Sequence, residues 1–113
     1  MPHCIIEYSR SLEQQGEPAV WVDTVFQSVL DSGIAPAAAI KVRGIGYDHY
    51  RIGEPADDFL HVSLRLLPGR TPEIKQQLTA RVLEQLKQLG LSHTAISVEI
   101  CEMEAESYVR STV

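Results

Sequence analysis

The chain has 113 residues, of which 44% are hydrophobic and 22% are charged, and its formal net charge at pH 7 is −5. These values predict a single domain over residues 1–113 with one hydrophobic core. Nucleic acid and anionic membrane surfaces attract basic proteins, so neither is an expected partner of this acidic chain. No apolar run approaches the roughly 20 residues of a membrane helix, and the first ten residues lack a secretory signal pattern, which predicts a cytoplasmic location.

The first half of the chain predicts a strand, a helix and a second strand. A short β-rich apolar run covers residues 4–8 and is followed by a polar stretch over residues 9–16. Pro18 stands where a helix commonly begins, apolar residues then recur at helical spacing, and Gly33 is a typical helix stop. The run 37–42 predicts the second strand.

The second half predicts the same order of elements after a loop over residues 43–58, which contains three glycines and a proline. Residues 59–67 form the clearest strand pattern. The triplet from Thr71 predicts a helix start, with a hydroxyl N-cap followed by Pro and Glu. The apolar stripe of this helix consists of Ile74, Leu78, Val82, Leu86 and Leu89. Gly90 ends the helix, and residues 95–100 form the last strand.

The two halves resemble each other, with repeats over about 2–46 and 59–103. His3 corresponds to His61, and the glycine that ends the first helix, Gly33, corresponds to Gly90. A strand-helix-strand unit requires parallel strands and a right-handed crossover. Two such units predict an α+β fold, with a four-stranded sheet and both helices on one face.

The second face of this sheet is expected to need a cover. Ile5, Phe59 and Leu67 fall on the side of the strands away from the helices, so both sides carry apolar residues. A sheet with one face in water alternates more cleanly between apolar and polar residues. A homo-oligomer that covers the second face is therefore expected.

Several segments resemble the 5-carboxymethyl-2-hydroxymuconate isomerase family of the tautomerase superfamily. They are the opening Met1 to His3, the turn from Gly33 to Pro36, the strand from Phe59 to Arg65, and the segment from Pro68 to Thr71. The resemblance extends from Pro2 to about Glu102. It implies the tautomerase fold, a homotrimer, no cofactor, and an isomerase in which an amino-terminal proline is the catalytic base.

Pro2 is the candidate catalytic residue. Removal of Met1 would leave a free secondary amine, and an α-amino group has an ordinary pKa of about 7.7–8.0. Nearby cations and partial burial would lower that pKa, so that the neutral amine could take a proton from an enol or from carbon beside a carbonyl. If Met1 stays attached, the Pro2 nitrogen is an amide and cannot act as a base. The alternative role of Pro2 is simply to begin a strand, where its missing N–H costs nothing.

Arg70 and Lys41 are the candidate substrate-binding residues. Arg70 precedes the second helix, where its guanidinium and the helix N-terminus both favour a carboxylate. Lys41 stands where the family resemblance implies arginine, and lysine keeps the charge without the bidentate fork. Lys41 and Arg43 share one face of the second strand. The alternative for all three is ordinary surface charge.

The histidines, the two strand glutamates and the two cysteines form no recognisable catalytic or metal-binding motif. His3 and His61 lie on strands and are expected to be packed and hydrogen-bonded, while the other histidines lack metal-ligand spacing. Glu7 and Glu99 fit either an interface or a site. Cys4 and Cys101 have no companion cysteine or histidine at metal-site spacing, which favours free thiols over a disulfide or a metal site. No metal or cofactor is expected. The pair Gly44-x-Gly46 precedes no helix and is too short for a dinucleotide fingerprint.

The function expected from the resemblance is a keto–enol tautomerase or isomerase. Its substrate would be a small unsaturated carboxylate such as 5-carboxymethyl-2-hydroxymuconate, from the catabolism of aromatic compounds. One alternative keeps the fold and acts on a different 2-oxo acid or enol. Another is a ferredoxin-like module that binds a small ligand without chemistry, which would order its strands differently and pair them antiparallel across the repeat.

Overall fold

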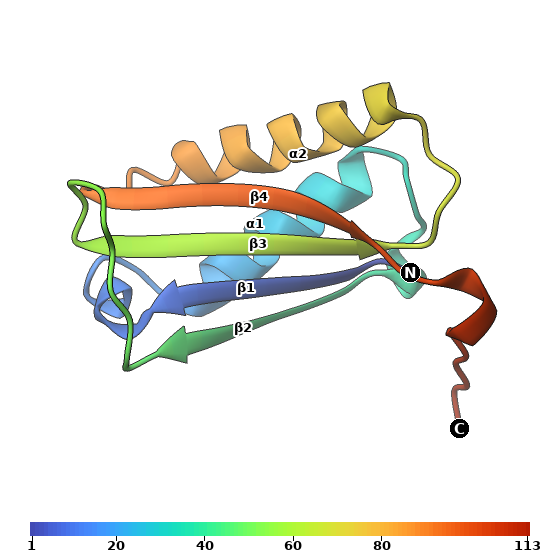
Figure 1. Ribbon diagram of the computed structural model, residues 1–113, viewed down its shortest axis with the longest axis horizontal. Helices are drawn as coiled ribbons and strands as arrows, with labels where there is room; N and C mark the ends of the chain where they lie inside the picture. Colours follow the sequence, from blue (N-terminus) through green and yellow to red (C-terminus); the bar gives the residue numbers. More distant parts are fainter.

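The computed structural model describes residues 1–113 as one mixed sheet backed by two helices (Figure 1). The strands and helices follow each other in the order β1 (His3–Ser9), α1 (Pro18–Asp31), β2 (Lys41–Tyr47), β3 (Asp58–Leu66), α2 (Pro72–Lys87) and β4 (Thr94–Glu102). Short 3-10 turns lie at η1 (Arg10–Gln14), η2 (Ala37–Ala39) and η3 (Ala105–Ser107). In Figure 1, α1 lies behind the strands and α2 runs above β4. Both helices pack into the same core, so one sheet face is left without a cover from this chain. The predicted fold class is confirmed.

The strand order β2-β1-β3-β4 reflects the sequence repeat. Each unit pairs its two strands in parallel, β1 with β2 and β3 with β4, and the units meet along an antiparallel β1–β3 pair. His3 and His61 are 58 residues apart in the chain, and the same offset relates Ile5 to Ser63, which lie directly opposite each other in the β1–β3 pair. A local two-fold relation between the units therefore passes near this pair. The order of the strands and the parallel pairing within each unit exclude the ferredoxin-like arrangement.

The helix boundaries follow from local chemistry. Thr71 caps α2, because its Oγ1 accepts a hydrogen bond from the N–H of Ile74 at 3.2 Å. Gly33 and Gly90 follow the two helices with φ of +77° and +76°, a conformation that favours glycine. These glycines let the chain turn back sharply toward the sheet after each helix.

The core lies between the sheet and the helices. Alternate residues of the central strands and one stripe of each helix are buried there, and Tyr8 packs edge-on against Trp21 with ring centroids 4.9 Å apart. The main buried residues are Cys4, Ile6, Leu60, Val62, Leu64, Leu66, Val25, Val29, Leu78, Val82 and Leu86. Ile74, expected in the stripe of α2, is 45% exposed. Burial of this apolar surface holds both helices against a single sheet face.

The predicted second strand is wrong in its position. Residues 37–39 form the turn η2, and β2 extends from Lys41 to Tyr47, into the segment expected to be a loop. Gly44 and Gly46 are the physical reason for the error. A Cβ at Gly46 would lie 3.0 Å from Cε2 of Tyr8, so glycine here permits the close approach of β2 to β1.

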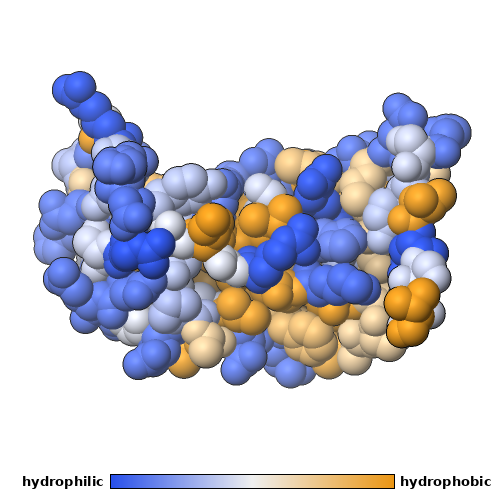
Figure 2. Space-filling view, turned by 90° about the horizontal axis from the view of Figure 1, so that it is seen from below, coloured by the Kyte–Doolittle hydropathy of each residue, from blue (hydrophilic) through white to orange (hydrophobic).

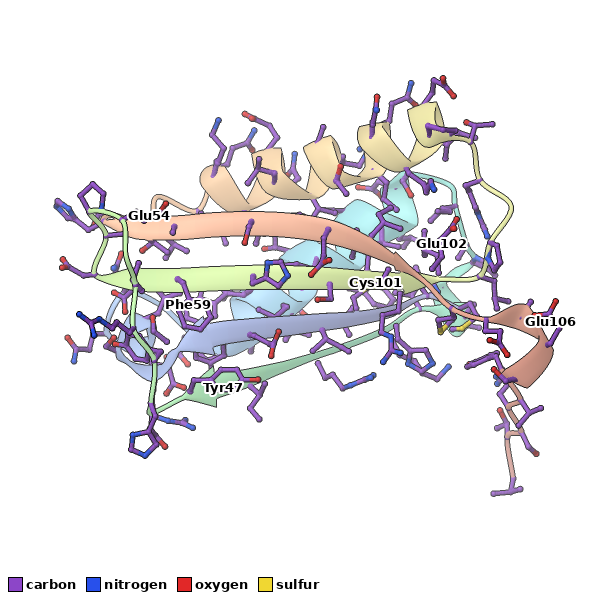
Figure 3. All side chains as sticks on the ribbon, viewed as in Figure 1. Tyr47, Glu54, Phe59, Cys101, Glu102 and Glu106 are labelled. Atoms are coloured by element: carbon purple, nitrogen blue, oxygen red, sulfur yellow. The ribbon has the colours of Figure 1, made fainter.

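The open face of the sheet is more polar than expected. Ile5, Phe59 and Ile45 lie on it among polar and charged side chains, which include His3, Glu7, His61, Ser63, Arg65, Ser97 and Glu99. Tyr47 and Phe59 lie in front of the sheet in Figure 3, with their ring centroids 6.3 Å apart. The upper outline of Figure 2, which corresponds to this face, is hollowed between two raised ends. Ile5 and Phe59 thus lie on the second face as predicted, but most of the other positions on this face are polar.

Candidate functional site

The amino terminus is fastened at one end of the sheet. The Met1 amino group donates to the carbonyl of Ala39 at 2.8 Å, and the N–H of Lys41 donates to the carbonyl of Pro2 at 3.0 Å. Pro2 itself is buried. Because β1 and β2 are parallel, the beginnings of both strands meet here, and Pro2 and Lys41 are brought together across a gap of about 40 residues in the chain.

Positive charge gathers around this end. Burial lowers the pKa of the Met1 amino group below its ordinary value, and the charges of Lys41, Arg110 and Arg70 lower it further. Both candidate substrate-binding residues therefore act electrostatically on the amino terminus. In a chain of net charge −5, this local cluster of cations is the feature that can attract a small anion.

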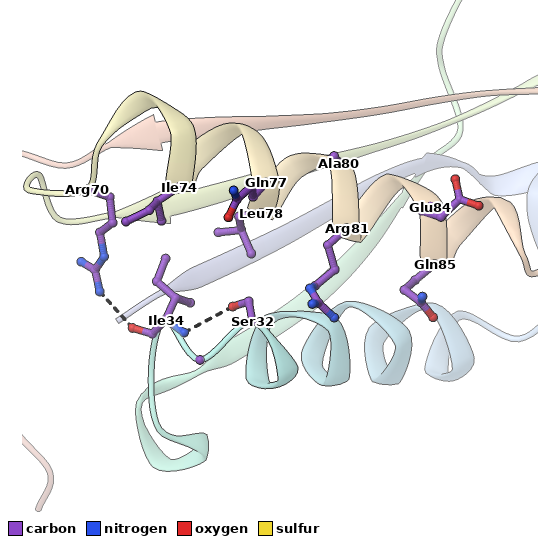
Figure 4. Close-up of a pocket in the computed structure, with 11 residues that line it drawn as sticks. Ser32, Ile34, Arg70, Ile74, Gln77, Leu78, Ala80, Arg81, Glu84 and Gln85 are labelled. Carbon is purple, nitrogen blue, oxygen red and sulfur yellow. Dashed lines mark hydrogen bonds between the residues drawn. The ribbon is translucent and has the colours of Figure 1, made fainter.

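Arg70 lies in the connection between β3 and α2 and is partly buried. Its Nη2 donates to the carbonyl of Ile34 at 2.9 Å, as the dashed line in Figure 4 marks. This contact holds the connection against the end of α1. Arg70 also lines a groove of about 1030 Å³ between the helices, together with Ile34, Ile74 and Arg81. Pro2 and Lys41 do not line the groove, so it shares only Arg70 with the amino-terminal cluster.

His3, the residue after Pro2, has a partner on each ring nitrogen. Its Nδ1 lies 3.2 Å from Nη1 of Arg43, and its Nε2 lies 3.2 Å from the hydroxyl of Tyr108. Burial lowers the pKa of His3, and the charges of Arg43 and Lys41 add to the effect. The lowered pKa favours the neutral ring, and the ring is hydrogen-bonded, as the sequence predicts.

A second polar cluster lies in the middle of the open face. His61 places Nδ1 2.6 Å from Oγ of Ser97 and Nε2 2.6 Å from Oε2 of Glu99. The hydrogen bonds from His61 and Cys101 lower the pKa of Glu99. Glu7, on the neighbouring strand, accepts from the hydroxyl of Tyr47. These residues satisfy one another and have no contact with the amino terminus, which favours a structural or interface role for them.

Both cysteines are free thiols in the structure. Burial raises the pKa of Cys4 to about 12, which leaves a packed and unreactive side chain. Cys101 is half-buried, and burial also raises its pKa. No three His, Cys, Asp or Glu side chains are grouped in a way that could hold a metal ion. None of the helices is long and apolar enough to cross a membrane.

The sequence reasoning missed the contribution of the C-terminal segment. Tyr108 contacts His3 from 105 positions further along the chain, and the positive charge of Arg110 helps to lower the pKa of the amino terminus. No motif or periodicity after β4 distinguished these residues. An aromatic residue and a cation two positions apart, in a tail otherwise rich in small and acidic residues, were the only available signal.

Comparison with known proteins agrees with this architecture. The family model described as 5-carboxymethyl-2-hydroxymuconate isomerase matches residues 2–113. A 5-carboxymethyl-2-hydroxymuconate Delta-isomerase of Escherichia coli is 27% identical over 89 residues, which are 77% of this chain and 71% of that protein.

Two solved structures are similar in fold. One is a 5-carboxymethyl-2-hydroxymuconate isomerase from Deinococcus radiodurans R1, with a TM-score of 0.85 and 21% identity, covering 99% of this chain and 90% of that one. The other is described as the W0 fused 4-OT wild-type symmetric trimer, with a TM-score of 0.74 and 17% identity, covering 92% and 88% of the two chains.

The duplicated strand-helix-strand architecture, with a cationic corner at the amino terminus, defines a small isomerase of the tautomerase superfamily. Within that class, the chain belongs to the 5-carboxymethyl-2-hydroxymuconate isomerase family, whose model matches it from Pro2 to its last residue. The expected isomerase class is thereby confirmed.

Proposed function

We propose that this isomerase moves a proton on an unsaturated carboxylate through the amino group of Pro2, once Met1 has been removed. The single observation that carries the proposal is the convergence of Lys41, Arg70 and Arg110 on the amino terminus. The same cations would act on a Pro2 amine, which would lie one residue further into the sheet. A neutral amine at pH 7 is a competent general base.

The cations would also hold the substrate. Arg70 and Lys41 offer positive charge to carboxylates, and this charge would offset the negative charge that forms on oxygen as the proton leaves carbon or the enol hydroxyl. Pro2 would then return the proton at another position. The family name and the Escherichia coli relative make 5-carboxymethyl-2-hydroxymuconate, from aromatic catabolism, the first substrate to assay.

A second substrate class is favoured by Lys41. Lysine binds a carboxylate as a point charge, whereas the arginine implied at this position by the family resemblance would bind it through two parallel hydrogen bonds. The pocket would then tolerate other 2-oxo acids or enols. A panel of these compounds, assayed beside 5-carboxymethyl-2-hydroxymuconate, separates the two candidates by their kcat/KM values.

Pro2→Ala tests the mechanism. We expect kcat to fall about 100-fold, because a primary amine replaces the secondary amine and the ring that holds the nitrogen in place is lost. A chain with one extra alanine before Pro2 keeps the ring but converts its nitrogen to an amide, and we expect no turnover from it. Pro55→Ala, in an exposed loop, is the matched control and should retain the parent rate.

Intact mass accompanies these assays. The parent and Pro2→Ala proteins should both lack the mass of one methionine. Parent turnover by a processed Pro2→Ala protein would contradict the mechanism, and so would full activity in a protein that retains Met1.

The assembly is proposed to be a homotrimer. The 4-OT structure with a similar fold is described as a symmetric trimer, and no part of this chain covers the open face of the sheet. Cytoplasmic location stays a prediction of the sequence.

A further inference from the structure

The C-terminal segment returns to the proposed active site. After β4, the N–H of Met103 donates to the carbonyl of Leu66 at 2.7 Å, and η3 turns the chain beside the amino terminus (Figure 1). Glu106, labelled in Figure 3, marks this turn. The half-buried ring of Tyr108 then meets His3 edge-on, with ring centroids 6.1 Å apart. Tyr108 is thus held next to the residue that follows Pro2.

The direction of the hydrogen bonds in this corner is determined by Arg43. A guanidinium group can only donate, so Nδ1 of His3 must accept from Nη1 of Arg43. In the neutral ring the proton then lies on Nε2, which donates to the hydroxyl oxygen of Tyr108. Arg43 therefore selects one tautomer of His3.

This tautomer of His3 makes the Tyr108 hydroxyl a hydrogen-bond acceptor. The hydroxyl oxygen of Tyr108 accepts from His3, while its own O–H has no acceptor in the chain. A hydroxyl that already accepts one hydrogen bond is a stronger donor of another. The positive charges of Lys41, Arg43 and Arg65 all act on His3, and Arg65 lies directly opposite His3 in the β1–β3 pair. These charges would attract an anion to the same end of the sheet as the Tyr108 hydroxyl.

We propose that Tyr108 binds the substrate, donating its O–H to the substrate oxygen that becomes negative during proton transfer, and that His3 and Arg43 are positioning residues for it. The inference rests on the proposed function of Pro2. It adds a neutral donor to a site otherwise built from cations, and it makes the C-terminal segment part of the site. Arg110, two residues further on, brings a further cation with the same segment.

Tyr108→Phe is the direct test, since it removes the donor and keeps the ring that packs on His3. We expect kcat with 5-carboxymethyl-2-hydroxymuconate to fall about 100-fold, as for other oxyanion donors, while KM changes less than about threefold. Tyr50→Phe is the matched control. The hydroxyl of Tyr50 lies 2.8 Å from Oγ of Ser11 at the other end of the sheet, and its loss should leave kcat unchanged.

The positioning role of His3 has its own test. His3→Gln can accept from Arg43 through its carbonyl oxygen and donate to Tyr108 through its amide, so it should retain most of the parent kcat. His3→Leu can do neither and should lose activity as Tyr108→Phe does. A residue that only packs against the tail would not show this difference between glutamine and leucine.

The outcomes are distinguishable. Loss of turnover in Pro2→Ala with parent kcat in Tyr108→Phe would overturn this inference and leave the proposed function in place. Parent turnover in Pro2→Ala, or a parent protein that converts none of the enol panel, would overturn both. Hydrogen exchange of residues 103–113 completes the test. A fall in kcat in Tyr108→Phe that comes with lost protection of this segment means that Tyr108 only fastens the tail, and the inference fails.

Discussion

The proton affinity of the amino terminus depends on residues that are distant in the chain. Lys41 arrives from β2, Arg70 from the connection before α2, and Arg110 from the C-terminal segment. Each positive charge disfavours a second positive charge on the amine, and burial acts in the same direction. The result is an amino group that loses its proton at lower pH than a free chain end. For the Pro2 amine this gives a definite expectation of pH dependence.

We expect kcat/KM of the parent protein to rise with pH through the pKa of the Pro2 amine and to level off above it. The sign follows from the base role, because only the neutral amine accepts a proton and this form predominates above its pKa. The midpoint should lie below the 7.7–8.0 of an ordinary α-amino group. Lys41→Ala should move the midpoint to higher pH, because it removes a positive charge that disfavours protonation of the amine.

The control for this experiment is Lys87→Ala, which removes an exposed cation from the last turn of α2 and should leave the midpoint in place. A midpoint that is the same in the Lys41→Ala and parent proteins would show that Lys41 does not act on the catalytic base.

At the scale of elements, β2 is shaped by its two glycines. It pairs with β1 over its whole length, from Lys41 opposite His3 to Tyr47 opposite Ser9. Gly46 is in close contact with the side chains of Tyr8 and Arg10, whereas Gly44 has more room. The strand can lie flat against this part of β1 only because position 46 lacks a side chain.

Gly46→Ala is therefore expected to lower the free energy of unfolding by about 1–3 kcal/mol, because its Cβ would lie 3.0 Å from Cε2 of Tyr8 and 3.2 Å from Cζ of Arg10. Gly44→Ala is the matched control. Its Cβ would meet its nearest atoms at 3.7 Å, so its stability should stay within about 0.5 kcal/mol of the parent. Urea unfolding at one fixed protein concentration measures the free energy of unfolding of both variants and of the parent. Equal stability of the two variants would contradict the packing argument.

At the scale of the whole molecule, the sheet is asymmetric. One face is covered by helices, and the other presents a mixed surface on which Ile5, Ile45 and Phe59 lie among polar and charged residues. A homo-oligomeric interface with satisfied polar pairs, such as that of His61 with Glu99, suits such a surface better than a purely apolar contact would. The proposed trimer is thus expected to use the open face.

Ile45→Asp tests this expectation, because Ile45 lies on the open face and is 53% exposed in the single chain. A carboxylate buried there would oppose association, and sedimentation velocity should show a shift from trimer to monomer. Ile74→Asp, at a position 45% exposed on the helix side, should sediment as the parent does. Trimeric Ile45→Asp, or dissociated Ile74→Asp, would place the interface elsewhere.

Local patterns in the sequence were sufficient for most elements of this fold. The helix caps at Thr71, Gly33 and Gly90, the apolar stripes and the repeat were all recognisable, because these signals involve neighbours in the chain. The motif around Pro2 indicated the family and the candidate base. The position of β2 was mispredicted, because glycine in a strand and glycine in a loop look alike until the partner strand is known.

Tertiary structure alone decided what surrounds Pro2. The sequence by itself determined the chemistry that each side chain can perform, including the proposed base at Pro2 and the positive charges of Lys41 and Arg70. It did not determine that Tyr108 reaches His3 across 105 residues, that Arg43 orients His3, or that Arg110 joins the cations. The physical reason is that strand register and the return of the C-terminal segment depend on packing between distant parts of the chain, for which single-sequence patterns carry no signal.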